Sequence, residues 1–279
     1  MQGSTKKSSS QSEKKWPAIN REPYFENDSV RLYQGDCLEL LSEMEVTHKS
    51  RFDAVITDPP YCSGAVTKSG RDAAPATKYC QDGKTLGRPS FTGDSRDPRS
   101  FVFWSTMWFA YARRLCRPSA YGLVFIDWRQ LPVVTDVYQA SGWTWKGICV
   151  WNKGRGARAP HKGYFRHQSE FIVWGTNGKV PKLLDRGPFD GVHSIPIRQS
   201  DKHHITGKPT PLLRELVQVA PVDGLILDPF AGSGTTGVSA TLEGRRAILI
   251  EQSEECCQVA AKRLEAAAVG EQLPYSRAA

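Results

Sequence analysis

Short apolar segments with the character of strands alternate with helical segments along most of this 279-residue chain, and this order restricts its fold more than any other feature. Strands that alternate with helices form a parallel sheet whose two faces the helices cover. An α/β fold with a doubly wound, mostly parallel sheet is therefore expected. Strands are expected at 29–33, 52–57, 121–128, 147–151, 170–174, 225–227 and 247–250, and helices at 37–44, 101–115, 132–140, 211–219, from 235 and at 254–268.

Composition excludes several classes of protein. With 39% hydrophobic and 24% charged residues, the chain is neither disordered throughout nor a disulfide scaffold. No apolar run approaches the roughly 20 residues that span a bilayer, and the polar segment 1–15 does not resemble a secretory signal. A cytoplasmic protein without a membrane partner is expected. Seven cysteines, none at metal-ligand spacing, predict reduced thiols and no metal.

The charge balance favours a polyanionic partner. Lys and Arg number 37 against 29 Asp and Glu, a net charge of +8 with a pI near 9.1. Such an excess raises the rate of encounter with polyanions. Charge alone does not distinguish nucleic acid from an anionic membrane surface.

A glycine-rich turn occupies 228–237, which reads Asp-Pro-Phe-Ala-Gly-Ser-Gly-Thr-Thr-Gly after an expected strand. Small residues there let the backbone approach a ligand, and the following helix presents free amides. The three glycines match the dinucleotide fingerprint, and Glu251 ends the next strand, where an acid can bind ribose hydroxyls. An adenosine-containing cofactor is expected, either NAD or S-adenosylmethionine. The alternative is a tight turn without a ligand.

A second unusual turn, Thr57-Asp58-Pro59-Pro60-Tyr61, follows the expected strand 52–57. The two prolines restrict the backbone, so the aspartate and the aromatic ring are held in set directions. A carboxylate and a backbone carbonyl there can accept hydrogen bonds from an amino group, and the ring offers a stacking face for a planar heterocycle. The alternative is a rigid turn that ends a strand.

Taken in order, these segments resemble the DNA amino-methyltransferases of the beta arrangement, in which the catalytic half precedes the cofactor half. The resemblance covers about residues 30 to 265. Asp58–Tyr61 resembles the family's Asp-Pro-Pro-Tyr motif, and Phe230–Gly234 its Phe-x-Gly-x-Gly motif. The segment 204–209 is similar to the cofactor-carboxylate segment, Gly35-Asp36 to an adenine-contacting position, and Glu251 to the ribose acid.

The resemblance implies a Rossmann-like methyltransferase fold with a late antiparallel hairpin, permuted so that the catalytic half comes first. It implies S-adenosylmethionine as the cofactor and double-stranded DNA as the partner. The catalytic residues that it implies are Asp58, Pro59, Pro60 and Tyr61. The cofactor-binding residues that it implies are Asp36, Cys37, Asp58, Thr206, Lys208, Pro209, Asp228, Phe230, Ala231, Gly232, Ser233, Gly234, Thr235 and Glu251.

The family's reaction transfers a methyl group from a sulfonium to an exocyclic amino nitrogen. Asp58 and the carbonyl of Pro59 would accept hydrogen bonds from the amino group, while Tyr61 would stack on the base. The base must leave the duplex to reach such a pocket. Methylation at cytosine carbon-5 would need a Pro-Cys nucleophile, which the chain lacks, and Cys62 is interpreted as a residue of the pocket wall.

DNA contact is expected from the basic loop 152–168, which contains five Lys or Arg residues and no acid. Basic side chains on a glycine-rich loop suit phosphate contact, and an aromatic side chain there could fill the gap left by a flipped base. A solvated basic hairpin is the alternative. The predicted DNA-binding residues are Lys153, Arg155, Arg158, Lys162, Tyr164 and Arg166.

A single methyltransferase domain is expected over 21–270, flanked by a flexible basic tail, 1–20, and a short tail, 271–279. Within it, 62–100 is expected to be a mobile loop and 178–203 a short, irregular target-recognition insert. So short an insert predicts little sequence specificity, as in broad-specificity prophage methylases. A homodimer remains open.

The resemblance also implies adenine N6 as the methylated atom, because Asp at the first position of the motif is more typical of the family's adenine branch and Ser of its cytosine branch; cytosine N4 is the alternative. Other functions also stay open. They are an NAD-dependent oxidoreductase, a DNA-binding protein whose methylation site has decayed, and a methyltransferase acting on RNA or on a protein amide.

Overall fold

A computed structural model describes most of the chain, namely residues 16–17, 19–47, 51–62, 96–155, 157, 159, 161–182, 185–196 and 207–270. The predicted tail 271–279 lies outside these residues, as do most of the predicted tail 1–20 and of the loop 62–100. The described strands are β1 Phe25–Glu26, β2 Val30–Gln34, β3 Phe52–Thr57, β4 Cys116–Ile126, β5 Thr144–Asn152, β6 Ser169–Thr176, β7 Val192–Ser194, β8 Leu225–Asp228 and β9 Arg246–Glu251. The helices are α1 Cys37–Thr47, α4 Pro98–Arg114, α5 Leu131–Ala140, α6 Thr210–Leu216, the 3₁₀ helix η3 Val217–Val219, α7 Thr235–Leu242 and α8 Glu254–Ala268.

The described strands form one nine-stranded sheet in the order β1-β2-β9-β8-β3-β4-β6-β5-β7. Strands β2, β9, β8, β3 and β4 are mutually parallel, whereas β6 runs antiparallel to both β4 and β5. The expected doubly wound, mostly parallel sheet with a late antiparallel hairpin is therefore confirmed.

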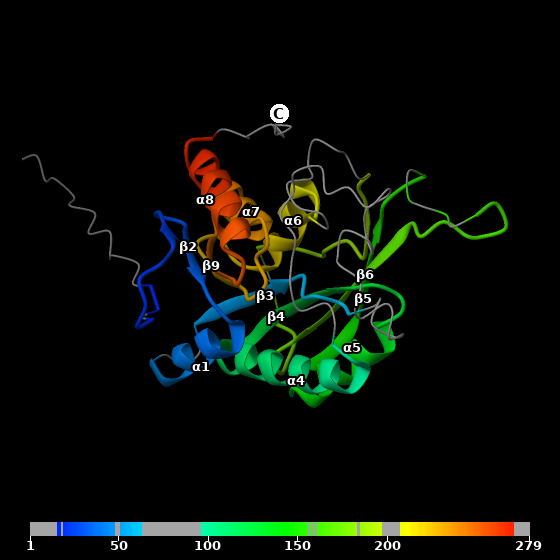
Figure 1. The fold of residues 1–279 in the computed structure, drawn as a ribbon, viewed down its shortest axis with the longest axis horizontal. Coiled ribbons are helices and arrows are strands. Elements are labelled where there is room, and N and C mark those ends of the chain that lie inside the picture. The colour runs from blue at the N-terminus through cyan, green and yellow to red at the C-terminus, as the bar shows by residue number, and fades with distance from the viewer. Residues whose placement is uncertain are drawn as a thin grey trace, which may run out of the picture.

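Helices cover both faces of the sheet, with α1, α4 and α5 on one face and α6, α7 and α8 on the other (Figure 1). The side chains of β3 alternate between the two layers. Val55 belongs to the hydrophobic cluster beneath α1, α4 and α5, while Ala54 and Ile56 belong to the cluster beneath α6, α7 and α8. The sequence of a central strand that is buried on both faces is a nearly continuous apolar run. The segment 52–57 has such a sequence.

The sheet order brings the two unusual turns together. Strands β3 and β8 are parallel neighbours in which Ala54 pairs with Ile226 and Val55 with Leu227. Both strands therefore end at the same edge of the sheet. There the hydroxyl of Thr57 donates a 2.6 Å hydrogen bond to the carboxylate of Asp228. The Asp-Pro-Pro-Tyr turn and the glycine-rich turn accordingly lie side by side, although about 170 residues separate them.

The structure departs from the expected elements at several places, among them the two-residue strand β1, which was not expected, and β5, which begins at Thr144 rather than at 147. Residues 178–203 were expected to be irregular, but β7 lies within them and pairs in parallel with β5. Its three residues have no apolar alternation, so only pairing to an existing sheet edge makes them a strand. Strand β4 begins at Cys116 and ends at Ile126, rather than spanning 121–128. In the described part of the chain, no helix has the length and apolar character needed to cross a membrane.

Candidate active site

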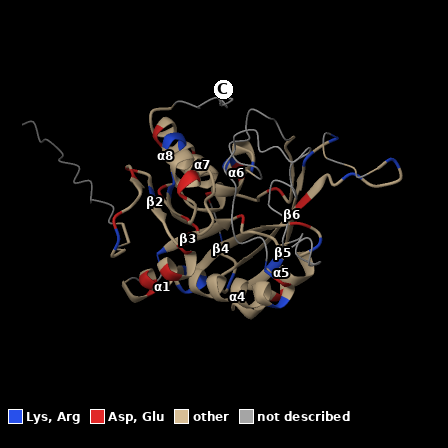
Figure 2. Cartoon of the chain, in the orientation of Figure 1, with Lys and Arg blue, Asp and Glu red and all other residues tan. Residues whose placement is uncertain are grey.

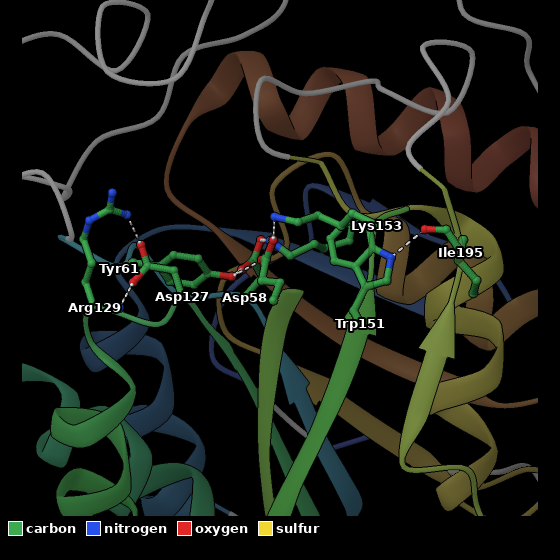
Figure 3. Close-up of polar contacts among 9 residues, drawn as sticks. Asp58, Tyr61, Asp127, Arg129, Trp151, Lys153 and Ile195 are labelled. Atoms are coloured by element: carbon green, nitrogen blue, oxygen red, sulfur yellow. Dashed lines mark hydrogen bonds and ion pairs between the residues drawn. The ribbon is translucent and has the colours of Figure 1, made fainter. Parts of the chain in front are cut away.

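The Asp-Pro-Pro-Tyr turn carries a compact polar cluster. The hydroxyl of Tyr61 donates a 2.5 Å hydrogen bond to Oδ1 of Asp58 (Figure 3). Nζ of Lys208 donates one of 2.5 Å to Oδ2. The side chain of Lys208 is only 7% exposed. Lys208 was predicted to bind the cofactor, and its ammonium group lies between the carboxylates of Asp58, in the catalytic turn, and Glu170, on β6.

Glu170 completes this cluster and was missed in the sequence. It is 9% exposed and receives hydrogen bonds from the hydroxyl of Tyr61 at 2.7 Å and from Lys208 at 3.0 Å. Lys153 lies 3.3 Å from its second oxygen. The one available signal was a single acid directly before the apolar run 171–174.

The antiparallel course of β6 explains why Glu170 reaches this site. Phe171 pairs with Ile126, the last residue of β4, so Glu170 lies at the edge where the parallel strands end. A parallel strand in the place of β6 would have put its first residues at the opposite edge of the sheet. The direction of β6 is thus what brings this carboxylate to Asp58.

The cluster contains two lysines and two carboxylates with different electrostatic surroundings. Burial raises the pKa of Asp58; the contact with Lys208 lowers it, but the charge of Glu170 raises it again, and the net shift is upward. Burial alone would raise the pKa of Glu170 too, but Lys208 and Lys153 together lower it to about 2. Burial and the two carboxylates raise the pKa of Tyr61 well above its usual value, so its hydroxyl stays protonated and donates.

The glycine-rich turn leaves room beside its backbone. Gly232 has a φ of +52°, and a Cβ atom added to it would meet no heavy atom within 4 Å. Gly234 has a φ of +77°, and a Cβ there would lie 3.0 Å from the Cβ of Ala260. The first glycine therefore leaves open space in which a ligand can approach the backbone, and the second allows α7 to pack closely on α8.

Glu251 lies across this turn at the end of β9. One of its carboxylate oxygens accepts a 2.8 Å hydrogen bond from the amide of Gly232, and the other accepts one of 2.8 Å from the amide of Ser253. Burial raises its pKa. Because a carboxylate has about four acceptor positions, capacity remains for ligand hydroxyls. The open backbone and this acid suit a cofactor that carries a ribose.

Other predicted cofactor residues have structural contacts of their own. The buried carboxylate of Asp228 binds Thr57 and the amide of Phe230, and burial raises its pKa to about 6. The carboxylate of Asp36 accepts a 2.8 Å hydrogen bond from the amide of Leu38 at the start of α1. Pro209 precedes α6, and its carbonyl accepts hydrogen bonds from that helix.

The remaining described members of the predicted set belong to the glycine-rich turn, apart from Cys37 at the start of α1. The ring of Phe230 packs against Trp104 and Trp108. Cys37 and Ala231 are buried. Arg263, which the sequence analysis did not single out, donates hydrogen bonds to Ser233 and Thr235 and so ties the turn to α8. Thr206 lies outside the described residues.

The basic loop connects β5 and β6 and carries a series of Lys and Arg side chains (Figure 2). Four of the predicted DNA-binding residues are exposed there, namely Arg155, Lys162, Tyr164 and Arg166. Lys153 instead turns toward Glu170, with a side chain that is 17% exposed. Arg158 lies outside the described residues.

Two further predictions concern cysteines and metals. Cys62 is buried directly after the catalytic turn, and its sulfur lies 3.9 Å from the carbonyl oxygen of Pro60. Among the residues that the structure describes, no three His, Cys, Asp or Glu side chains are grouped so as to hold a metal ion.

Comparisons with known proteins agree with this geometry. The model of the N6_N4_Mtase family, described as DNA methylase, matches residues 52–262. The chain is 27% identical to the type II methyltransferase M2.MboI of Moraxella bovis, over 86% of this chain and 90% of that protein. It is also 27% identical to M2.DpnII of Streptococcus pneumoniae, over 88% of this chain and 92% of that protein.

Solved structures share the fold. The M1.HpyAVI complex with S-adenosylmethionine superposes with a TM-score of 0.62 at 22% identity, over 84% of this chain and 98% of that one. The cytosine-N4-specific PvuII DNA methyltransferase superposes with a TM-score of 0.66 at 17% identity, over 91% and 98%. The fold is thus the Rossmann-like one of methyltransferases that use S-adenosylmethionine. Since the family model matches most of the chain, this protein belongs to the N6/N4 family of DNA methylases and is a DNA methyltransferase that uses S-adenosylmethionine.

Proposed function

We propose that this enzyme methylates the exocyclic N6 amino group of an adenine flipped out of double-stranded DNA, and that it belongs to the beta arrangement of its family. The observation that carries the proposal is the cluster at the catalytic turn. A partly buried carboxylate, Asp58, lies beside the ring of Tyr61, at the sheet edge that also holds the glycine-rich turn. The bound cofactor supplies the methyl group as a sulfonium.

The amino nitrogen of a base is a poor nucleophile because its lone pair is delocalised into the ring. The carboxylate of Asp58 and the carbonyl of Pro59 would accept its two N–H groups and favour a tetrahedral nitrogen. In this structure Lys208 occupies one oxygen of Asp58. The incoming amino group would take that oxygen, while Lys208 stays paired with Glu170. Alignment of the nitrogen with the methyl group then provides much of the acceleration.

Cofactor binding is proposed for the glycine-rich turn. The open space at Gly232 suits close approach of the backbone, and Glu251 retains acceptor capacity for ribose hydroxyls. Membership of the DNA methylase family removes the NAD-dependent oxidoreductase from the alternatives.

The choice of adenine rests on the aspartate that begins the catalytic motif. Cytosine N4 is the second candidate, which the structural likeness to the cytosine-N4-specific PvuII enzyme favours. The test is digestion to nucleosides of DNA that the purified enzyme has methylated. N6-methyl-2′-deoxyadenosine is expected, and N4-methyl-2′-deoxycytidine in its place would overturn the choice. Absence of any methylated nucleoside would support a decayed methylation site.

Short or relaxed sequence specificity is proposed from the insert 178–203. In its described part, 178–182 and 185–196, the regular structure consists of the three-residue strand β7. Base readout in the major groove needs several side chains presented on a helix or a ribbon. Sequencing of methylated plasmid DNA tests this, and a single fixed motif of four or more base pairs would contradict it.

Glu170→Gln is expected to lower kcat about tenfold, because Tyr61 and Lys208 lose a charged anchor. Asp58 must be ionised to accept the amino group, so activity falls as the pH drops through its pKa. The charged groups around it are Lys208 and Glu170, and the negative charge of Glu170 raises its pKa. The acid limb of the kcat profile should therefore move to lower pH in this variant.

A purely structural role for Glu170 would lower the yield or the Tm without moving the acid limb. Glu215→Gln is the matched control, since Glu215 of α6 pairs with His193 and is half exposed. Its profile should coincide with that of the wild type. An unchanged profile in Glu170→Gln would contradict the proposed positioning role.

The basic loop is proposed to bind DNA phosphates. Arg155 and Lys162 are exposed and have no ion-pair partner among the described residues. Arg155→Ala and Lys162→Ala should each weaken DNA binding and reduce the slope of log K against log salt by about one. Titration of labelled DNA at several salt concentrations measures this. An unchanged slope would mean that the loop does not touch phosphate.

A further inference from the structure

An exposed indole stands at the end of β4. Trp128 is 50% exposed and lies in the turn between β4 and α5. The guanidinium of Arg129 lies 4.7 Å from the centre of its ring. Asp127 holds this turn, since its carboxylate accepts hydrogen bonds from the amides of Arg129 and Gln130 and pairs with the Arg129 side chain at 3.2 Å. The indole is therefore presented on a fixed turn.

Rings from the basic loop continue this surface. His167 lies nearly parallel to Trp128, with an interplanar angle of 13° and ring centres 6.5 Å apart. Tyr164 packs edge-on against His167 at 5.6 Å and is 49% exposed. Two segments distant in sequence, the β4–α5 turn and the β5–β6 loop, thus form one aromatic surface, which we call the Trp128 platform and define as Trp128, Arg129, Tyr164 and His167.

The platform lies beside the methylation site without being part of it. Ile126, at the end of β4, pairs with Phe171, so the turn that follows β4 is next to Glu170. Strand β4 also pairs with β3, whose last residue precedes Asp58. Figure 3 shows Asp127 and Arg129 in the same close-up as Asp58 and Tyr61. DNA that places a base at Tyr61 would therefore pass the Trp128 platform.

The aromatic rings and neighbouring cations of the platform are suited to binding a nucleobase. Every base has a π-face that stacks on an aromatic ring, and cations beside the ring strengthen the contact. The loop that supplies Tyr164 and His167 has no acidic residue between 152 and 169. The carboxylate within the turn itself, Asp127, is already paired with Arg129. The surroundings therefore suit a planar ring attached to an anionic backbone.

We propose that the Trp128 platform binds a nucleobase of the DNA substrate outside the methylation pocket by stacking it on the indole of Trp128. This deepens the proposed function and rests on it, since the base comes from the DNA that is methylated. Stacking of this second base on the platform would fix the position of the DNA strand on one side of the flipped base. Stacking on Trp128 differs from the phosphate contacts proposed for Arg155 and Lys162, because it adds affinity for DNA without an ionic contact.

The experiment compares Trp128→Ala, Trp128→Phe and the control Trp145→Ala. Trp145 is also partly exposed, at 39%, but it pairs with Gly175 at the opposite end of the sheet. A fluorescein-labelled DNA oligonucleotide is titrated with each protein at several salt concentrations. KM is then measured for DNA and for S-adenosylmethionine.

Trp128→Ala should weaken DNA binding about tenfold and raise the KM for DNA by a similar factor. This is the effect expected for the loss of one base–aromatic stack. Trp128→Phe and Trp145→Ala should stay within about twofold of the wild type, since the first keeps a stacking face. The salt slope should not change in Trp128→Ala, because no charge is lost. The KM for S-adenosylmethionine should also stay the same.

Wild-type-like DNA binding in Trp128→Ala would overturn the platform, and so would an equal loss in Trp145→Ala. A reduced salt slope in Trp128→Ala would overturn it too, because it would show that phosphate contacts had changed. Failure of the wild type to methylate an amino group of DNA would overturn the proposed function instead. The two failures are therefore distinguishable.

Discussion

Asp58→Ala is expected to lower kcat by about 10³-fold while binding of S-adenosylmethionine is at least partly retained. The variant removes the acceptor proposed for the amino group of the base. The proposed cofactor residues Gly232, in the turn after β8, and Glu251, at the end of β9, bind each other rather than Asp58. Transfer of labelled methyl groups to DNA and equilibrium titration with the cofactor measure the two effects separately.

Asp58→Asn tests whether the charge or only the shape of the side chain matters. It keeps one oxygen acceptor, and Lys208 retains Glu170 as a partner, so the fold should be preserved while kcat remains low. Asp136→Asn, an exposed acid of α5, serves as the control and should behave as the wild type. Substantial turnover in Asp58→Ala would show that this carboxylate is not the acceptor.

Lys208→Met is expected to destabilise the fold by about 3–5 kcal/mol at neutral pH. Methionine has a similar length but no charge, so Asp58 and Glu170 would face each other without the cation between them. Breaking a buried ion pair by removing one partner costs far more than removing an exposed charge. Urea unfolding followed by circular dichroism measures the loss as a shift of the midpoint.

The pH dependence of this loss follows from Glu170. Its pKa is lowered to about 2 in the folded protein. Pairing of Glu170 with the lysines therefore stabilises the fold at pH values above about 4.3, the pKa of Glu in the unfolded chain. This contribution disappears as the pH falls toward 2. The difference between wild type and Lys208→Met should accordingly shrink in acid.

Two controls accompany Lys208→Met. The double variant Asp58→Asn, Lys208→Met should recover much of the stability, because the unpaired charge of Asp58 is gone and Glu170 keeps Lys153 as a partner. Lys162→Met, at an exposed position of the basic loop, should have almost no effect. A decrease of less than about 1 kcal/mol in the free energy of unfolding of Lys208→Met would mean that the ion pairs of this cluster do not stabilise the fold.

Much of the fold could be predicted because the determining patterns are local. The apolar run 52–57 became β3 with the expected bounds, and the segment 254–268 became α8. Proline after β3 and glycine after β8 mark the two turns through the backbone angles that they allow. Strand β7 could not be predicted, since pairing with β5 rather than its own residues makes it a strand.

The sequence by itself determined the alternation of strands and helices and the motif residues Asp58, Tyr61 and Glu251, because these depend on neighbours along the chain. Only the tertiary structure decided that Lys208 and Lys153 turn inward to a carboxylate, and that Glu170 is that carboxylate. It also decided that Trp128 and His167 share a surface. These contacts depend on the direction of β6 and on the loop that precedes it. A buried charge needs a partner of opposite charge. That partner can be distant along the chain, and no local sequence pattern specifies which residue it is.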